Sequence, residues 1–256
     1  MKDIELEGKN KEYFKTKIPT GSRDLNLWLS GGYDKGVITL FYGPAASGKS
    51  NFTMLASSFL ARENKKVIYI DTEGSFSLDR IRQISGVDCY DVLKNIIILK
   101  PLSFYEQKKI FLKLFRESRS KNISLIVVDS MTMLYRLDLA EAKKKGLKDV
   151  EKINYDLLNQ MKSLHEIAIK RNIPILITAQ VYSNFLSEED FIAGKEASVN
   201  VVGGDILKYW SKCIIEFQNK NGRKKAILRK HRSLPEREFN FLIVNEGIVK
   251  KRFFSY

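Results

Sequence analysis

The segment from Gly43 to Ser50 has the residue types and the spacing of a phosphate-binding loop. It reads GPAASGKS and fits the pattern G-x-x-x-x-G-K-[ST] in full, directly after the apolar run VITLFY at 37–42. Gly43 lets the chain leave a strand in a tight turn, and Gly48 lets backbone N–H groups approach phosphate oxygens closely. The residues from Ser50 onward are expected to open a helix whose positive dipole end faces the anion. The segment therefore predicts a nucleoside triphosphate site.

Side chains within this segment have separate expected roles. Lys49 would reach the β and γ phosphates of ATP, and the hydroxyl of Ser50 would bind Mg2+. We expect nucleotide contacts from Gly43, Pro44, Ala45, Ala46, Ser47, Gly48, Lys49, Ser50 and Asn51. An ordinary glycine-serine turn is the alternative interpretation, and the strand pattern before it and the helix pattern after it make that alternative the weaker one.

Three polar residues that follow apolar runs supply the other groups that ATP hydrolysis needs. Asp129 ends the run LIVVD, where a lone carboxylate is costly to bury unless it faces a cation, so we expect it to support Mg2+. Capping of the next helix is the alternative role for Asp129. Glu73, in VIYIDTEG, is a better candidate than Asp71 for polarising the attacking water. Gln180, at the end of ILITAQ, would bind the γ phosphate and report its loss, which completes a catalytic set of Glu73, Lys49 and Gln180.

The elements that must position these residues follow from the pattern of apolar residues. Apolar runs of strand length occur at 37–42, 67–70, 96–99, 125–128 and 175–178, and helical patterns occur at 50–64, 106–118 and 153–171. Such strands separated by helices predict a parallel sheet covered on both faces. The last third contains CIIEFQ, KKAILRKH and EFNFLIV, which predict antiparallel strands. The expected fold class is α/β, with a mainly parallel twisted sheet flanked by helices and a small C-terminal antiparallel β section.

Composition restricts the broad class of the protein. A chain of 256 residues with 44% hydrophobic content can bury the core of one domain. Each apolar run is shorter than the roughly 18 residues of a membrane helix, and the N-terminus lacks the apolar core of a signal peptide. We therefore expect a cytoplasmic protein with no membrane partner. Its cysteines and histidines, Cys89, Cys213, His165 and His231, lack the spacing of metal ligands.

Positive charge is concentrated near the C-terminus. The net charge is +14, and residues 219–237 contribute half of it, with eight basic residues against Glu236 alone. A basic cluster of this density favours a polyanion, and nucleic acid is the usual one, although a solvated lysine-rich face is the alternative. The DNA contacts expected from this region are Lys224, Lys225, Arg229, Lys230, His231 and Arg232.

The motifs GPAASGKS, DTEG, LIVVDS and TAQ occur in the order, and with roughly the separations, of the RecA-like recombinase ATPases, which the chain resembles. The segments IYIDTEGSFSLDRI, GGDILKYWSK and LPEREFNFLIVNEGI are similar to the archaeal and eukaryal branch of that family. Without a helical DNA-binding domain in front of the core, the chain most resembles the archaeal RadB-type paralogues of the RadA recombinases. The resemblance implies an N-terminal segment at 1–17 and a single RecA-like P-loop ATPase core at 18–256.

The resemblance also implies roles for single residues. Glu73 corresponds to the water-activating glutamate, Asp129 to the acid that supports Mg2+, and Gln180 to the γ-phosphate sensor. Arg80 falls where relatives place an arginine against adenine. The segment from Leu137 to about Lys152 matches the first DNA loop of the family, and the segment 181–202 matches the second. The DNA contacts expected in and beside the first loop are Arg136, Lys143, Lys144 and Lys145.

Three departures from the family pattern modify the expected function. The second loop is acidic, with four acids against Lys195 in residues 183–200, and an acidic loop would repel phosphates. Residues 1–17 contain no convincing Phe and Ala polymerisation motif. Lys230 stands where active relatives place an acid that caps the nucleotide of a neighbouring subunit. The lysine at this position suggests a surface that is used for DNA.

These features together predict an ATP- and DNA-binding accessory protein of homologous recombination and DNA repair. We expect ATP and Mg2+ as cofactors, weak ATPase activity and little or no strand exchange by the protein alone. Expected partners are single-stranded DNA, with double-stranded or branched DNA in addition, the main recombinase or other repair proteins, and a second copy in a homodimer. The expected location is the nucleoid. The alternatives are an active DNA-stimulated recombinase that forms filaments, and a nucleotide-dependent protein scaffold.

Overall fold

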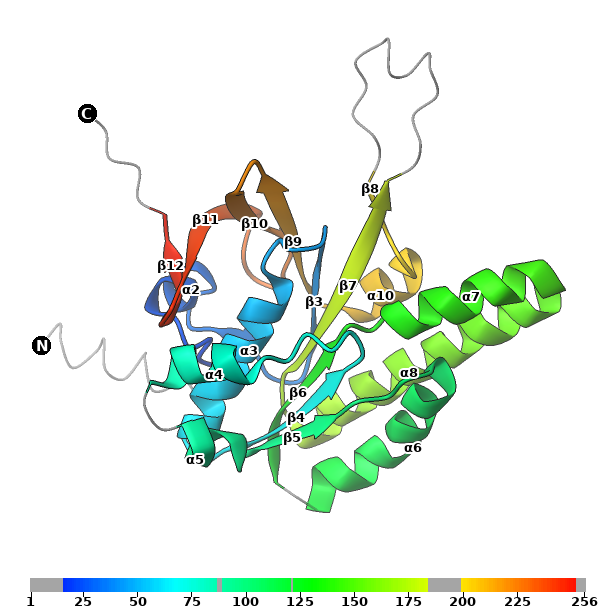
Figure 1. Ribbon diagram of the computed structural model, residues 1–256, viewed down its shortest axis with the longest axis horizontal. Helices are drawn as coiled ribbons and strands as arrows, with labels where there is room; N and C mark the ends of the chain where they lie inside the picture. Colours follow the sequence, from blue (N-terminus) through cyan, green and yellow to red (C-terminus); the bar gives the residue numbers. More distant parts are fainter. Residues whose placement is uncertain (1–15, 87–88, 121, 184–198, 252–256) are drawn as a thin grey trace, which may run out of the picture.

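The apolar runs of the sequence become strands of one central sheet, which lies between layers of helices (Figure 1). The computed structural model describes residues 16–86, 89–120, 122–183 and 199–251. Within them the sheet has ten strands in the order β12-β11-β10-β9-β3-β7-β6-β4-β5, with β8 paired to β7, and a second small sheet pairs β1 with β2. The strands are β1 (Lys17–Ile18), β2 (Tyr33–Asp34), β3 (Ile38–Gly43), β4 (Lys66–Asp71), β5 (Ile96–Leu99), β6 (Ile123–Asp129), β7 (Ile175–Ser183), β8 (Val199–Val201), β9 (Cys213–Lys220), β10 (Arg223–Lys230), β11 (Arg237–Val244) and β12 (Gly247–Lys250).

The large sheet has a parallel part and an antiparallel part, as predicted. Strands β9, β3, β7, β6, β4 and β5 run parallel to their neighbours, whereas β9, β10, β11 and β12 alternate in direction. The parallel register places Gly43 opposite Gln180 and Asp71 opposite Asp129. Since the carboxyl ends of parallel strands meet at one edge, this register brings the candidate site residues together.

Helices cover both faces of the sheet, and each face has its own apolar core. On one face, α3 packs with α2, α4 and α5 through residues such as Phe52, Leu55 and Ile81. On the other face, α6, α7, α8 and α10 pack through residues such as Phe111 and Leu164. The helices are α2 (Arg23–Trp28), α3 (Lys49–Arg62), α4 (Leu78–Ser85), α5 (Cys89–Leu93), α6 (Phe104–Ser120), α7 (Met133–Lys145), α8 (Leu147–Arg171) and α10 (Gly204–Trp210). In the described ranges, no helix has both the length and the apolar character needed to cross a membrane.

The segment 137–152 is helical, so the prediction of a DNA loop there was wrong. It forms most of α7 and the first turns of α8, and the two helices meet at Gly146, which has a φ of +134°. Leucine, alanine, lysine and glutamate make up most of α7, and all four have high helix propensity. Buried Leu134 and Ala142 attach α7 to the protein. Helix α8 accordingly begins at Leu147, well before the predicted start near Ile153.

Two further elements differ from the predicted boundaries. Strand β7 continues beyond Gln180 to Ser183, because Val181 pairs antiparallel with Val201 of β8. The prediction that this strand ends at Gln180 was therefore wrong. The antiparallel section also has a fourth strand, β12, which no sequence pattern indicated. The proposed second DNA loop lies largely in residues 184–198, outside the described residues, as does most of the N-terminal segment 1–17.

A cluster of phenylalanines joins α3 to the antiparallel section. The ring of Phe52 in α3 lies 4.7 Å from that of Phe217 in β9 and 5.1 Å from that of Phe241 in β11, both in edge-to-face geometry. Phe41 of β3 adds a third edge contact to Phe52 at 6.0 Å. Edge-to-face pairs contribute beyond the burial of their apolar area. The cluster therefore fixes the helix that begins at the phosphate loop against the last strands of the chain.

Phe217→Ala should lower the free energy of unfolding by about 3–5 kcal/mol, because it removes a fully buried ring from the centre of this cluster. Urea unfolding followed by circular dichroism measures the change. Leu112→Ala is the matched control, since the Leu112 side chain is 77% exposed and its removal should change stability by no more than about 0.5 kcal/mol. Similar losses in the two variants would contradict this account of the core.

Candidate nucleotide site and nucleic-acid surface

The predicted phosphate loop connects the end of β3 to the start of α3. Gly48 is the N-cap residue of α3, with a φ of +112°, and no side chain caps the helix. The hydroxyl of Ser47 is buried and has no hydrogen-bond partner among the described residues. Free N–H groups at a helix start and an unpaired hydroxyl are groups that phosphate oxygens can satisfy. The loop therefore fits the phosphate chain of a nucleotide.

The ammonium group of Lys49 lies over the loop. Its Nζ donates hydrogen bonds to Gly43 O at 2.9 Å and to Pro44 O at 2.8 Å, and the residue is only 8% exposed. Burial lowers the pKa of Lys49, and the negative charges of Glu73 and Asp129 oppose that shift. A cation that has lost most of its water gains more from a nearby anion than an exposed one. Lys49 is thus placed to exchange loop carbonyls for phosphate oxygens.

Asp129 ends β6, as predicted, and its carboxylate is held by three hydroxyl groups. Oδ2 accepts hydrogen bonds from Tyr69 and Ser75, each at 2.8 Å, and Oδ1 accepts one from Thr178 at 2.5 Å. The Tyr69 oxygen also lies 3.0 Å from the hydroxyl of Thr53 in α3. Burial raises the pKa of Tyr69, and the Asp129 charge adds to that rise, so the phenol remains a donor. Sequence reasoning missed the residues of this network other than Asp129.

Asp71 positions the loop that carries Glu73. The two Asp71 oxygens accept the backbone N–H groups of Ser75 at 2.9 Å and Phe76 at 3.2 Å, so this carboxylate is committed to structure. Glu73 instead lies exposed at the carboxyl edge of the sheet, and its Oε1 accepts a hydrogen bond from Gln180 Nε2 at 2.9 Å. The fold therefore brings Glu73 and Gln180 together, and Glu73, unlike Asp71, remains exposed at this edge.

Mg2+ with a nucleotide fits the same edge. Ser50 lies in the first turn of α3, and Asp129 and Glu73 supply negative charge near the buried Lys49. Both Asp129 oxygens already accept hydroxyl hydrogen bonds, which suits a carboxylate that holds the water shell of the ion. Oxygen donors of these types are the ligands that Mg2+ prefers.

Arg80 is more firmly bound to the protein than the expected adenine contact requires. Its guanidinium donates hydrogen bonds to the side chain of Asn51 at 2.8 Å and to the backbone oxygens of Val244 at 2.9 Å and Gly247 at 3.1 Å. These bonds lie in the plane of the group, and the flat faces are the part that stacks on rings. Any contact of Arg80 with adenine would therefore use a face of the guanidinium.

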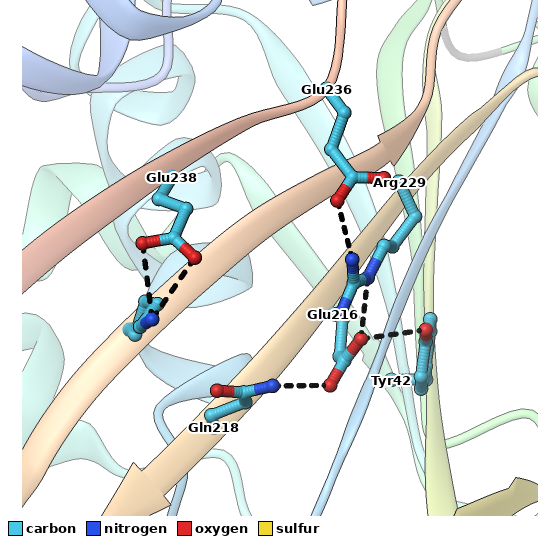
Figure 2. Close-up of polar contacts among 7 residues, drawn as sticks. Tyr42, Glu216, Gln218, Arg229, Glu236 and Glu238 are labelled. Atoms are coloured by element: carbon cyan, nitrogen blue, oxygen red, sulfur yellow. Dashed lines mark hydrogen bonds and ion pairs between the residues drawn. The ribbon is translucent and has the colours of Figure 1, made fainter.

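The basic region is partly neutralised within the β section (Figure 2). Arg229 donates to Glu216 at 2.7 Å and to Glu236 at 2.5 Å, and Lys225 forms an ion pair with Glu238 at 3.0 Å. Burial raises the pKa of Glu216, but hydrogen bonds, among them that from Arg229, outweigh it and the net shift is downward. Lys225 and Arg229, both DNA candidates of this region, therefore already have carboxylate partners within the β section.

The end of β10 and the turn after it expose Lys230 and Arg232 but not the side chain of His231. The His231 side chain is 2% exposed, and its Nε2 lies 3.4 Å from Asp34 Oδ2. The expectation that His231 contacts DNA was therefore wrong, because burial against Asp34 removes it from the surface. Arg232 also lies 3.3 Å from Asp34, yet its side chain is 53% exposed. Lys230 is exposed and donates to the carbonyl of Lys208 at 3.3 Å.

The remaining DNA candidates form a second basic region. Arg136, Lys143, Lys144 and Lys145 are exposed along α7, and Lys144 pairs with Glu141 at 2.7 Å. Helix α7 belongs to the helical layer beside α8, well separated in Figure 1 from the hairpin of β9 and β10. The structure thus divides the predicted DNA contacts between two separate regions.

Comparisons with known proteins agree with the motifs. The family model described as Rad51 matches residues 12–251. A protein of Methanocaldococcus jannaschii named "DNA repair and recombination protein RadB" is 42% identical, over 86% of this chain and 96% of its own length. A protein of the same name from Methanobrevibacter smithii is 37% identical, over 91% of this chain and 95% of its own. A solved structure described as the RadB recombinase superposes with a TM-score of 0.71 at 32% identity, and the match covers 91% of this chain and 99% of that one.

Lys49→Ala should weaken the binding of ATP with Mg2+ by about 10- to 100-fold, because hydrogen bonds to charged groups contribute about 1.5–3 kcal/mol. Isothermal titration calorimetry measures the affinity directly. Lys65→Ala, at an exposed position beyond the far end of α3, is the matched control and should bind as the wild type does. Normal ATP affinity in Lys49→Ala would overturn the site assignment.

The buried His231 predicts a pH dependence of stability. Burial lowers its pKa; the charge of Asp34 opposes this shift, and the charges of Lys17 and Arg232 reinforce it. Nδ1 of His231 accepts the backbone N–H of Ser233 at 3.1 Å, which requires the neutral ring. The unfolded chain then takes up the proton first, so stability is full above about pH 6.5 and falls as the pH drops below that value.

Thermal unfolding near neutral pH and about two pH units lower checks this dependence. The loss of Tm should be larger for the wild type than for His231→Gln, which cannot take up the proton. Equal losses in both proteins would rule out His231 as the titrating group.

Proposed function

The chain belongs to the Rad51 family, and from that premise we propose that it is an ATP- and DNA-binding accessory protein of homologous recombination and DNA repair. The observation that carries the proposal is the single edge of the sheet where the phosphate loop, Asp129, Glu73 and Gln180 meet. Relatives that match most of this chain are named as DNA repair and recombination proteins. A role in DNA repair and recombination follows from that similarity, and the finer role is our proposal.

ATP binding rests on the residues around the phosphate loop. Lys49 and the N–H groups at the start of α3 would hold the phosphates, while Ser50 and Asp129 would hold Mg2+. The bound ion would supply charge neutralisation at the phosphates. Glu73 would accept the proton of the attacking water, and Gln180 would contact the terminal phosphate.

Slow turnover is supported by the state of the catalytic side chains. Glu73 accepts the hydrogen bond of Gln180 at 2.9 Å, so one of its two oxygens already has a partner and the attacking water competes with Gln180 for it. Three hydroxyl groups already occupy part of the accepting capacity of Asp129. Lys230 stands at the position where active relatives cap the nucleotide of a neighbour with an acid. These features favour weak ATPase activity and little strand exchange by the protein alone.

DNA binding is assigned first to the antiparallel β section. Lys230 and Arg232 are exposed at one end of it, and Lys224 lies near the other end of β10, beside the hairpin turn. The lysines of α7 would form a secondary contact. Such contacts with phosphates carry no base information, so single-stranded, double-stranded and branched DNA would all bind. We propose that the protein assists the main recombinase at the nucleoid, in the cytoplasm, as a homodimer.

The salt dependence of DNA binding tests this assignment. Fluorescence anisotropy with a single-stranded oligonucleotide should give a steep loss of affinity with salt, and a double variant Lys230→Ala with Arg232→Ala should make the slope of log K against log salt shallower by about 1.4, since each lost contact removes about 0.7. The matched control changes Lys143 and Lys144 to Ala on α7, which should have the smaller effect. A flat salt response would favour the nucleotide-dependent protein scaffold.

Particle size and strand exchange distinguish the remaining alternative. We expect the purified protein with ATP and DNA to stay small and to exchange few strands. Long filaments that pair homologous DNA would instead identify an active recombinase and refute the accessory role.

A further inference from the structure

The phosphate loop packs directly against the antiparallel section. A Cβ atom added to Gly43 would lie 2.3 Å from the backbone oxygen of Phe217 in β9. One added to Gly48 would lie 3.2 Å from two ring carbons of Phe241 in β11. Both glycines have φ angles in the range that glycine favours, +154° and +112°. The loop and the last strands of the chain therefore cannot move independently without opening a tightly packed contact.

Two side chains of the β9–β10 hairpin also bind the loop through hydrogen bonds. Lys224 Nζ donates to the backbone oxygen of Ala46, and Asn219 Nδ2 donates to the same oxygen at 3.5 Å. Lys224 and Asn219 are cross-strand partners in the hairpin. Ala46 has a φ of +56°, so its carbonyl belongs to the turned part of the loop. Lys224 thus carries its charge to the rim of the nucleotide site.

Lys224 is at the same time part of a basic groove on the hairpin. The groove has a volume of about 320 Å³, and no acid is among the described residues that line it. Its cationic lining residues are Lys220, Arg223, Lys224, Lys225 and Lys251. Of these, Lys225 has its charge partly neutralised by Glu238. A groove of this charge suits the phosphodiester backbone of a nucleic acid.

We propose that Lys224 is shared between the nucleotide site and the DNA surface, so that occupation of one site weakens binding at the other. The inference rests on the proposed function, because it assumes that ATP and DNA are the two ligands. With a triphosphate in the loop, Lys224 faces several negative charges instead of one carbonyl oxygen, and its ammonium is held at the loop. The groove then has one fewer cation for DNA. By thermodynamic linkage, DNA in the groove must lower the affinity for the nucleotide by the same factor.

The experiment measures this factor in both directions. The affinity for a fluorescent oligo-dT is determined by anisotropy with and without saturating Mg2+ and a non-hydrolysable ATP analogue. Calorimetry then gives the affinity for the same analogue with and without DNA. We expect DNA to bind at least about fivefold more weakly to the wild type when the analogue is present, with a matching effect of DNA on the analogue.

Two charge-neutralising variants separate Lys224 from the rest of the groove. Lys224→Gln keeps a side chain that can reach Ala46 but loses the charge, and the ratio of the two DNA affinities should fall to about one. Lys251→Gln removes one charge from the same groove without a contact to the loop. It should weaken DNA binding in both states and leave the ratio as in the wild type.

The outcomes distinguish this inference from the proposed function. A wild-type ratio of one, or an unchanged ratio in Lys224→Gln, would overturn the sharing of Lys224 while DNA binding by the protein stands. An increased DNA affinity with the analogue would also overturn it, since a shared cation can only give competition. Absence of DNA binding in every state would refute the proposed function and this inference with it.

Discussion

The buried carboxylate of Asp129 is the group on which the arrangement of the nucleotide site depends. A charge at 1% exposure is costly unless hydrogen bonds compensate for lost water, and three hydroxyl groups from β4, β7 and the loop after β4 provide them. Through Tyr69 the same network reaches Thr53 in the helix that follows the phosphate loop. The need to satisfy one carboxylate therefore helps to fix the relative positions of β7, which carries Gln180, and of the loop after β4, which carries Glu73.

The two ends of the strands in the antiparallel section have different charge arrangements. Toward the turn after β10, Glu216 and Glu236 bind Arg229, and the hydroxyl of Tyr42 adds a bond to Glu216 at 3.1 Å (Figure 2). At the other end, the hairpin of β9 and β10 gathers cations that line a groove without acids among its described residues. Charge that looked like a single cluster in the sequence thus forms two groups, one around Arg229 and one along the groove, where Lys225 is also paired with Glu238.

Much of the site was predictable because its signals are local in sequence. GPAASGKS, the acid at the end of LIVVD and the alternation of strands with helices each depend on neighbouring residues. The errors came from interactions between distant residues. Asp34 lies in a two-residue strand far from His231 in the chain, and no local pattern indicates that it buries that ring. Helix α7 was not predicted, because the resemblance to the family implied a loop at these residues. Their own helix propensity is nevertheless high.

The close contacts of Gly43 and Gly48 have a consequence for how the sequence can evolve. Both glycines are required by the approach of Phe217 and Phe241, whether or not a phosphate ever binds beside them. A descendant that lost ATP turnover would still need both glycines in order to keep this packing. In proteins built in this way, the two glycines of the motif are explained by the packing of the loop, and by themselves they do not report present activity.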